Sequence, residues 1–121
     1  MSKPRSRLIS KADSEFRTVR GFSTVIHFGR QAKHLPGQPN YDPSRSLITV
    51  SISELQDLVE YAAGTGTRRG VSRETVDFGV LIGLYRDLLS GRLMATTWGT
   101  IHYSARGVHV VPADPNVKKG G

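Results

Sequence analysis

The stretch MATTWGTIHYSARGVHVVP, residues 94–112, is the clearest β-hairpin signal in the chain. Two runs rich in β-branched and aromatic residues flank Ala105-Arg106-Gly107, a tripeptide suited to a reverse turn. Side chains alternate between the two faces of a strand, so the hairpin register determines which of them lie together. We expect the core face to carry the apolar residues of both strands, namely Ile101, Tyr103, Val108 and Val110.

The opposite face of the hairpin then carries His102, Ser104 and His109. A two-residue turn at Arg106-Gly107 gives this arrangement and sets Ser104 opposite His109. A three-residue loop instead sets His109 opposite Tyr103 and separates the two histidines. We favour the two-residue turn, because it keeps the apolar residues together on one face.

A short basic stretch at residues 28–37, FGRQAKHLPG, supplies a third histidine. Arg30, Lys33 and His34 precede a Pro36-Gly37 turn, so one titratable imidazole lies beside two fixed cations where the backbone bends. We interpret this stretch as one half of a phosphate site and the C-terminal hairpin as the other half.

The strongest helix signal begins at Ser51. Ser51 and Glu54 have the spacing of a capping box, and Gly64 stands where a helix of ordinary length would end. Between them runs an apolar stripe with helical period, which predicts a helix packed on a core: Ile52, Leu55, Leu58, Val59 and Ala62.

The remaining segments are mostly β-rich. Residues 16–28 predict one strand or a hairpin bent at a glycine, and residues 47–50 predict a short strand. Residues 74–86 favour one strand that contains two glycines, with a helix as the alternative. We therefore expect an α+β fold, a small single domain in which one main helix packs on an antiparallel β-sheet.

The glycine-rich stretch GTGTRRG at residues 64–70 lacks the ending of a phosphate-binding P-loop, so we expect a mobile loop. Its Arg68 and Arg69 are candidate contacts to a nucleic-acid backbone. We divide the chain into a flexible basic arm at 1–15, a domain at 16–113 and a basic tail at 114–121.

The charge balance favours a polyanionic partner. Seventeen Lys and Arg residues against ten Asp and Glu give a formal net charge of +7 and an isoelectric point near 10.3. A basic protein without such a partner is the alternative. The absence of cysteine excludes disulfides, thiolate zinc sites and cysteine nucleophiles. No apolar run reaches membrane-spanning length, and the N-terminus does not resemble a secretory signal, so we expect no membrane partner.

Imidazoles beside fixed cations suit cleavage of RNA through its own 2′-hydroxyl. One histidine would remove the 2′-OH proton, a second would protonate the departing 5′-oxygen, and Lys33 and Arg45 would stabilise the phosphorane. His34 or His109 would be the base, and the other or His102 the acid. His27 is interpreted as structural.

We expect no metal and no cofactor, because no zinc-type histidine motif is present and carboxylates are scarce around these histidines. The alternatives are a non-catalytic nucleic-acid-binding module, such as a phage head accessory domain, and a metal-dependent nuclease.

Over residues 27–113 the sequence resembles the polymorphic toxin type 50 family of bacterial and phage-associated proteins. The matching features occur in the same order: QAKHLPG (31–37), Tyr41, Arg45-Ser46, the AGTG after the helix, RETVDFG (73–79), Ile82-Gly83, Thr97 and IHYSARGVHVVP (101–112). The resemblance implies a ribonuclease toxin of the barnase–EndoU–colicin–RelE-like superfold.

By position, the resemblance implies the catalytic set Lys33, His34, Arg45, Thr97, His102, Tyr103, Ser104 and His109. We predict additional RNA contacts from Arg30, Tyr41, Arg68, Arg69, Trp98 and Arg106. The resemblance also implies a cognate immunity protein and action on RNA in a bacterial cytoplasm, after secretion or delivery from another cell or phage. This chain differs by starting at its own Met1 and carrying basic extensions, so a freestanding effector and an excised toxin domain both remain open.

Overall fold

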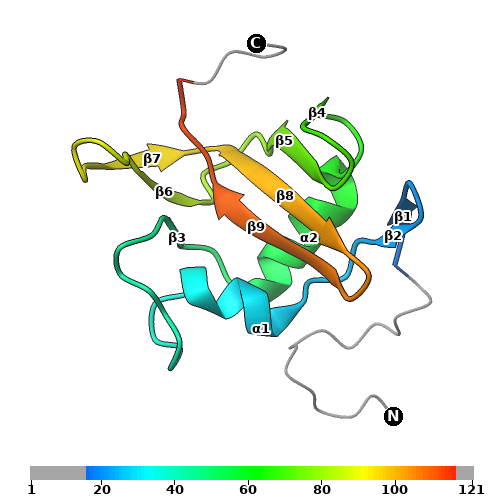
Figure 1. The fold of residues 1–121 in the computed structure, drawn as a ribbon, viewed down its shortest axis with the longest axis horizontal. Coiled ribbons are helices and arrows are strands. Elements are labelled where there is room, and N and C mark those ends of the chain that lie inside the picture. The colour runs from blue at the N-terminus through cyan, green and yellow to red at the C-terminus, as the bar shows by residue number, and fades with distance from the viewer. Residues whose placement is uncertain (1–15, 117–121) are drawn as a thin grey trace.

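The computed structural model describes residues 16–116, which form the expected small α+β domain (Figure 1). The predicted arm at 1–15 and residues 117–121 of the predicted tail lie outside the described residues. The helices are α1 (Phe28–Gln31), the 3-10 helix η2 (Ala32–His34) and α2 (Ile52–Ala62). The strands are β1 (Thr18–Val19), β2 (Phe22–Ser23), β3 (Leu47–Ile48), β4 (Thr67–Arg68), β5 (Arg73–Asp77), β6 (Gly83–Arg86), β7 (Leu93–Thr96), β8 (Trp98–Ser104) and β9 (Gly107–Pro112).

These strands form three antiparallel sheets. The largest has the order β4-β5-β8-β9, the second has the order β3-β6-β7, and β1-β2 is a hairpin of its own. In the part of the chain that the structure describes, no helix is long and apolar enough to cross a membrane.

Helix α2 forms as its sequence predicts. The Ser51 hydroxyl accepts a hydrogen bond from the Glu54 backbone N–H at 3.0 Å, which satisfies one of the free donors of the first turn. Gly64 follows the helix with a φ of +93°, a conformation that glycine adopts without steric cost.

The core lies between α2 and one face of the four-stranded sheet, and α2 passes behind β8 and β9 in Figure 1. Leu55 and Val59 from the helix are fully buried, as are Ile101, Val108 and Val110 from the terminal hairpin. The predicted apolar face of that hairpin is therefore confirmed. Its opposite face, with His102 and His109, is turned away from the core.

The register of the terminal hairpin differs from the prediction by two residues, because the loop lies one residue earlier in the chain. The two-residue loop is Ala105-Arg106, so Ser104 pairs with Gly107 and His109 lies directly opposite His102. Gly107 is the first residue of β9 rather than part of the loop. A Cβ at Gly107 would collide with the Val25 carbonyl, so glycine is needed here for close backbone approach.

Two other segments differ from expectation, and a third contains helices that the sequence did not indicate. Residues 74–86 do not form one strand: β5 and β6 belong to different sheets, separated by a turn in which Gly79 has a φ of +81° and donates to Asp77 Oδ1 at 3.0 Å. The predicted loop at 64–70 contains β4, which pairs with β5. The basic stretch at 28–37 contains two short helices, α1 and η2.

Residues 16–28 form a hairpin, one of the two expected forms, but its strands have only two residues each. The following segment covers the free edge of β9. Val108 N–H donates to the Val25 carbonyl, and His27 N–H donates to the Val108 carbonyl, both at 2.7 Å. Covering the edge satisfies backbone groups that an edge strand leaves unpaired, and it fixes where α1 begins.

Candidate functional site

Three histidines form a row on the outer face of the four-stranded sheet. His102 and His109 pair across β8 and β9, and their rings are stacked with centroids 4.6 Å apart. His34, from η2, stacks on the other side of His109 with centroids 6.2 Å apart. The structure therefore brings together the two halves of the predicted phosphate site. His34 precedes His102 and His109 by 68 and 75 residues in the chain.

The side chain of Gln31 holds His34 in this place. It is fully buried, and its Nε2 donates to the Val110 carbonyl at 2.8 Å while its Oε1 accepts from the Val110 N–H at 2.7 Å. The amide thus extends the ladder at the edge of β9, one residue from His109. Since η2 follows Gln31 directly, this clamp fixes the start of the helix that carries His34.

The ring of His34 has one defined tautomer. Its Nδ1 lies 2.9 Å from the Ser46 carbonyl oxygen, which only accepts hydrogen bonds, so Nδ1 carries the proton. In the neutral ring Nε2 then holds a free lone pair. Ser46 is itself held, because its Oγ accepts from the Arg86 N–H at 2.9 Å.

All three imidazoles have lowered pKa values. Burial is the main cause for each, followed for His109 by the neighbouring His102 and His34 and by Arg30 and Lys33, which together bring the His109 pKa to about 4. The pKa of His102 is lowered next by Arg73 and His34. For His34, the Ser46 hydrogen bond partly opposes the effect of burial. The row is therefore neutral at pH 7 in the free protein.

Cations surround the row. His34 and Arg45 line one hollow of about 250 Å³, together with Val111 of β9. Arg45 Nε donates to Asp42 Oδ2 at 2.9 Å. The hydrogen bonds from Ser44, and then this one from Arg45, lower the Asp42 pKa to about 2.

Arg30 and Lys33 are exposed on α1 and η2. Both cations contribute to the lowered pKa of His109, and Lys33 also contributes to that of His34.

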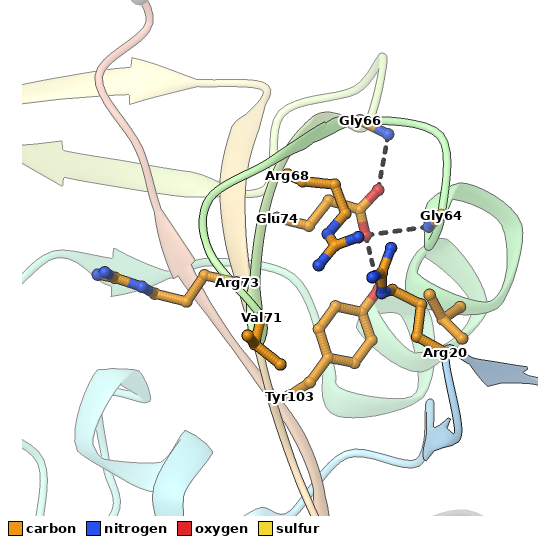
Figure 2. Close-up of a pocket in the computed structure, with 9 residues that line it drawn as sticks. Arg20, Gly64, Gly66, Arg68, Val71, Arg73, Glu74 and Tyr103 are labelled. Atoms are coloured by element: carbon orange, nitrogen blue, oxygen red, sulfur yellow. Dashed lines mark hydrogen bonds between the residues drawn. The ribbon is translucent and has the colours of Figure 1, made fainter.

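Sequence reasoning missed Arg73. It lies on β5 directly opposite His102, on the same face, so the row runs His34, His109, His102 and then Arg73 across neighbouring strands. Figure 2 shows the Arg73 side chain extending away from the group around Tyr103 on the other face. The pairing of β5 with β8 was the missing information, since RETVDFG by itself does not reveal which residue Arg73 faces.

Two residues of the implied catalytic set lie apart from the row. Tyr103 is buried on the core face, where its OH donates to Glu74 Oε1 at 2.6 Å (Figure 2). Burial, and then the Glu74 carboxylate, raise the Tyr103 pKa. Glu74 also accepts from the Gly64 and Gly66 N–H groups, so the pair anchors the loop before β4. Thr97 Oγ1 donates to Asp77 Oδ1 at 2.7 Å, at the far end of β8.

Ser104 lies on the face of His102, but its hydroxyl is engaged in the hairpin turn. It donates to the Gly107 carbonyl at 2.9 Å and accepts from the Arg106 N–H at 3.2 Å. Arg106 is exposed beside it at the tip. His27, predicted to be structural, is the N-cap of α1: its Nδ1 accepts from the Arg30 N–H at 3.2 Å.

The other predicted RNA contacts are spread over the surface. Trp98 lies on the row's face, four residues along β8 from His102. Arg69 Nε donates to Thr75 Oγ1 at 3.2 Å, near Trp98, whereas Arg68 lines the Tyr103–Glu74 pocket on the other face. Tyr41 lies in the loop after η2, half-buried. Within residues 16–116, no group of three or more histidine or acidic side chains is arranged to hold a metal ion.

Comparison with known proteins agrees with the resemblance drawn from the sequence. A search of curated proteins found no match to the chain. The family model of bacterial toxin 50 matches residues 26–112, which span both halves of the histidine row. Because this match covers most of the sequence, the chain belongs to the bacterial toxin 50 family.

Proposed function

We propose that the protein is a metal-independent endoribonuclease that cleaves RNA by attack of its own 2′-hydroxyl. The observation that carries this proposal is the row of three stacked imidazoles ending in Arg73. Imidazoles exchange protons near neutral pH, and the surrounding guanidinium and ammonium groups match the charge of a phosphodiester.

The sequence leaves two candidates for the base, His34 and His109, and His34 is the better placed of the two. Its Nδ1–H is held by Ser46, so its Nε2 is available to remove the proton from the 2′-OH. The 2′-oxygen then attacks phosphorus, and the bond from phosphorus to the 5′-oxygen breaks. His102, at the opposite end of the row from His34, donates a proton to that oxygen. The products are a 2′,3′-cyclic phosphate and a free 5′-OH.

The middle ring, His109, is placed to contact the phosphate that lies between base and acid. Arg73 and Lys33 flank the row and would stabilise the developing phosphorane charge, together with Arg45. Substrate also changes the protonation of the site. A phosphodiester anion offsets the burial and cationic neighbours that lower the pKa of His102, which favours the protonated acid in the complex.

Membership of a bacterial toxin family supports a toxic role. In this proposal RNA is the molecule attacked. A cognate immunity protein and delivery from another cell or phage belong to the same proposal. So does the barnase–EndoU–colicin–RelE-like superfold, for which the helix packed on an antiparallel sheet is the supporting feature.

The test is to incubate the protein with labelled single-stranded RNA in excess EDTA, and with DNA of the same sequence. We expect RNA to be cut and DNA, which lacks the 2′-OH, to stay intact. His34→Asn should lower kcat by roughly 100- to 10,000-fold. His27→Asn is the matched control, because asparagine also caps helices well and His27 lies outside the row. Bound but intact RNA would instead favour the non-catalytic binding module.

A further inference from the structure

A second hollow lies on the same face of the sheet as the histidine row. It has a volume of about 300 Å³ and is lined by Thr65, Gly66, Thr67, Thr75, Asp77 and Trp98. The register places these residues together: Trp98 pairs with Asp77, and Thr75 pairs with both Thr67 and Thr100.

The lining combines a large aromatic ring with an open hydrogen-bond acceptor. Trp98 is half-buried, so part of its indole faces the hollow. Asp77 Oδ1 is engaged, since it accepts from the Gly79 N–H at 3.0 Å and from Thr97 Oγ1 at 2.7 Å. Asp77 is exposed, and both of the side-chain hydrogen bonds that it makes to described residues involve Oδ1, so Oδ2 has no partner among them. One carboxylate oxygen is thus left to accept from a bound molecule.

The hollow also has a fixed relation to the row. Trp98 and His102 are four residues apart on one regular strand, which corresponds to about 13 Å at 3.3 Å per residue. Both side chains point to the same face, because the strand alternates strictly between half-buried and buried positions. A chain whose phosphate lies on the row can therefore place a nearby nucleotide over Trp98.

We infer that this hollow binds a nucleobase of single-stranded RNA, which stacks on Trp98 and donates an N–H to Asp77 Oδ2. This inference rests on the proposed function for the identity of the nucleic acid. Stacking alone tolerates every base, because every base has a π-face. The carboxylate adds a preference: adenine, cytosine and guanine carry an exocyclic amino donor, whereas the N3–H of uracil lies between two carbonyl oxygens that the carboxylate repels.

Trp98 is the only tryptophan of the chain, so its fluorescence reports this hollow alone. The probes are short single-stranded oligodeoxycytidine and oligodeoxyuridine, which stay uncut under the proposed mechanism. Both are pyrimidine chains with the same backbone charge, and they differ in the base edge. We expect saturable quenching of Trp98 by both, with the deoxycytidine chain binding roughly five- to tenfold more tightly.

Three variants and one control variant separate stacking from base-edge recognition, with the anisotropy of labelled oligonucleotide as the readout. Trp98→Ala should weaken binding roughly five- to 100-fold, whereas Trp98→Phe keeps a stacking ring and should lose much less. Asp77→Asn keeps an oxygen for Gly79 and Thr97 but presents an amide donor, so the cytidine preference should disappear or reverse. Asp57→Asn, an exposed acid on α2, should leave the preference unchanged.

Binding without any quenching of Trp98, or with equal affinity for the two chains, would overturn the inference. So would a cytidine preference that survives Asp77→Asn. The failure of this inference is distinguishable from the failure of the proposed function. Cleavage of RNA without quenching of Trp98 would support the nuclease and rule out the base site. Quenching of Trp98 with RNA left intact would support the base site and rule out the nuclease.

Discussion

Replacing Gln31 with methionine tests the contact that unites the two halves of the site. Methionine has a similar length but no polar atoms able to replace the amide. Gln31→Met therefore leaves the N–H and the carbonyl of Val110 unpaired in the interior. Each buried polar group left without a partner costs about 1–3 kcal/mol, so the free energy of unfolding should fall by about 2–5 kcal/mol.

The chain offers a matched control in Gln56. It is also buried, and it makes the same pair of bonds to backbone: its Oε1 accepts from the Ile26 N–H, and its Nε2 donates to the Thr24 carbonyl, both at 2.8 Å. Gln56→Met should cost a similar free energy, but it lies on α2, away from the row. Urea denaturation of both variants measures the two losses.

RNA cleavage by the folded variants then separates the effect of Gln31 on the position of His34 from its effect on the stability of the protein. Gln31→Met should lower kcat by about tenfold or more, because small displacements of reacting groups are costly, while Gln56→Met should leave it nearly unchanged. The reasoning is refuted if Gln31→Met loses less than about 1 kcal/mol, or if the two variants have the same kcat.

Three further predictions concern the row. The pKa of His109 is about 4 in the folded protein, against 6.5 ordinarily. As the pH falls, His109 is therefore protonated in the unfolded chain before it is protonated in the folded protein. Stability should thus fall as the pH drops from 6.5 to 4, by about 1–2 kcal/mol after allowing for partial exposure. His109→Gln should flatten this dependence in urea titrations, and an unchanged slope would contradict it. Because the pKa values of base and acid are both lowered, kcat/KM should peak below pH 6.5, and an optimum above 7.5 in a pH–rate profile would count against the assignment. Arg73→Gln should lower kcat/KM about 100-fold, whereas the exposed Arg92→Gln should not, and equal losses in steady-state assays would remove Arg73 from the site.

Local signals in the sequence were sufficient for much of the fold. The capping residue Ser51, the apolar stripe and Gly64 delimit α2, because these signals act within one or two helical turns. The alternation of apolar residues in the terminal hairpin also placed His102 and His109 on one face, although the position of Gly107 suggested the wrong loop.

The parts that could not be predicted depend on contacts between distant segments. Nothing local to Gln31 shows that its amide binds Val110, 79 residues away, and this contact determines where His34 lies. The pairing of Arg73 with His102 likewise requires knowing that β5 lies beside β8. The sequence of residues 74–86 predicts one strand because the turn at Gly79 separates two runs of similar composition.

The chemistry of the cleaved ends tests the central claim most directly. RNA should be incubated with the protein in excess EDTA, and the fragments analysed by mass spectrometry. We predict 2′,3′-cyclic phosphate at one new end and 5′-OH at the other, with both forming far more slowly in His34→Asn. Fragments ending in 3′-OH and 5′-phosphate, or RNA that is bound but remains intact, would contradict the account.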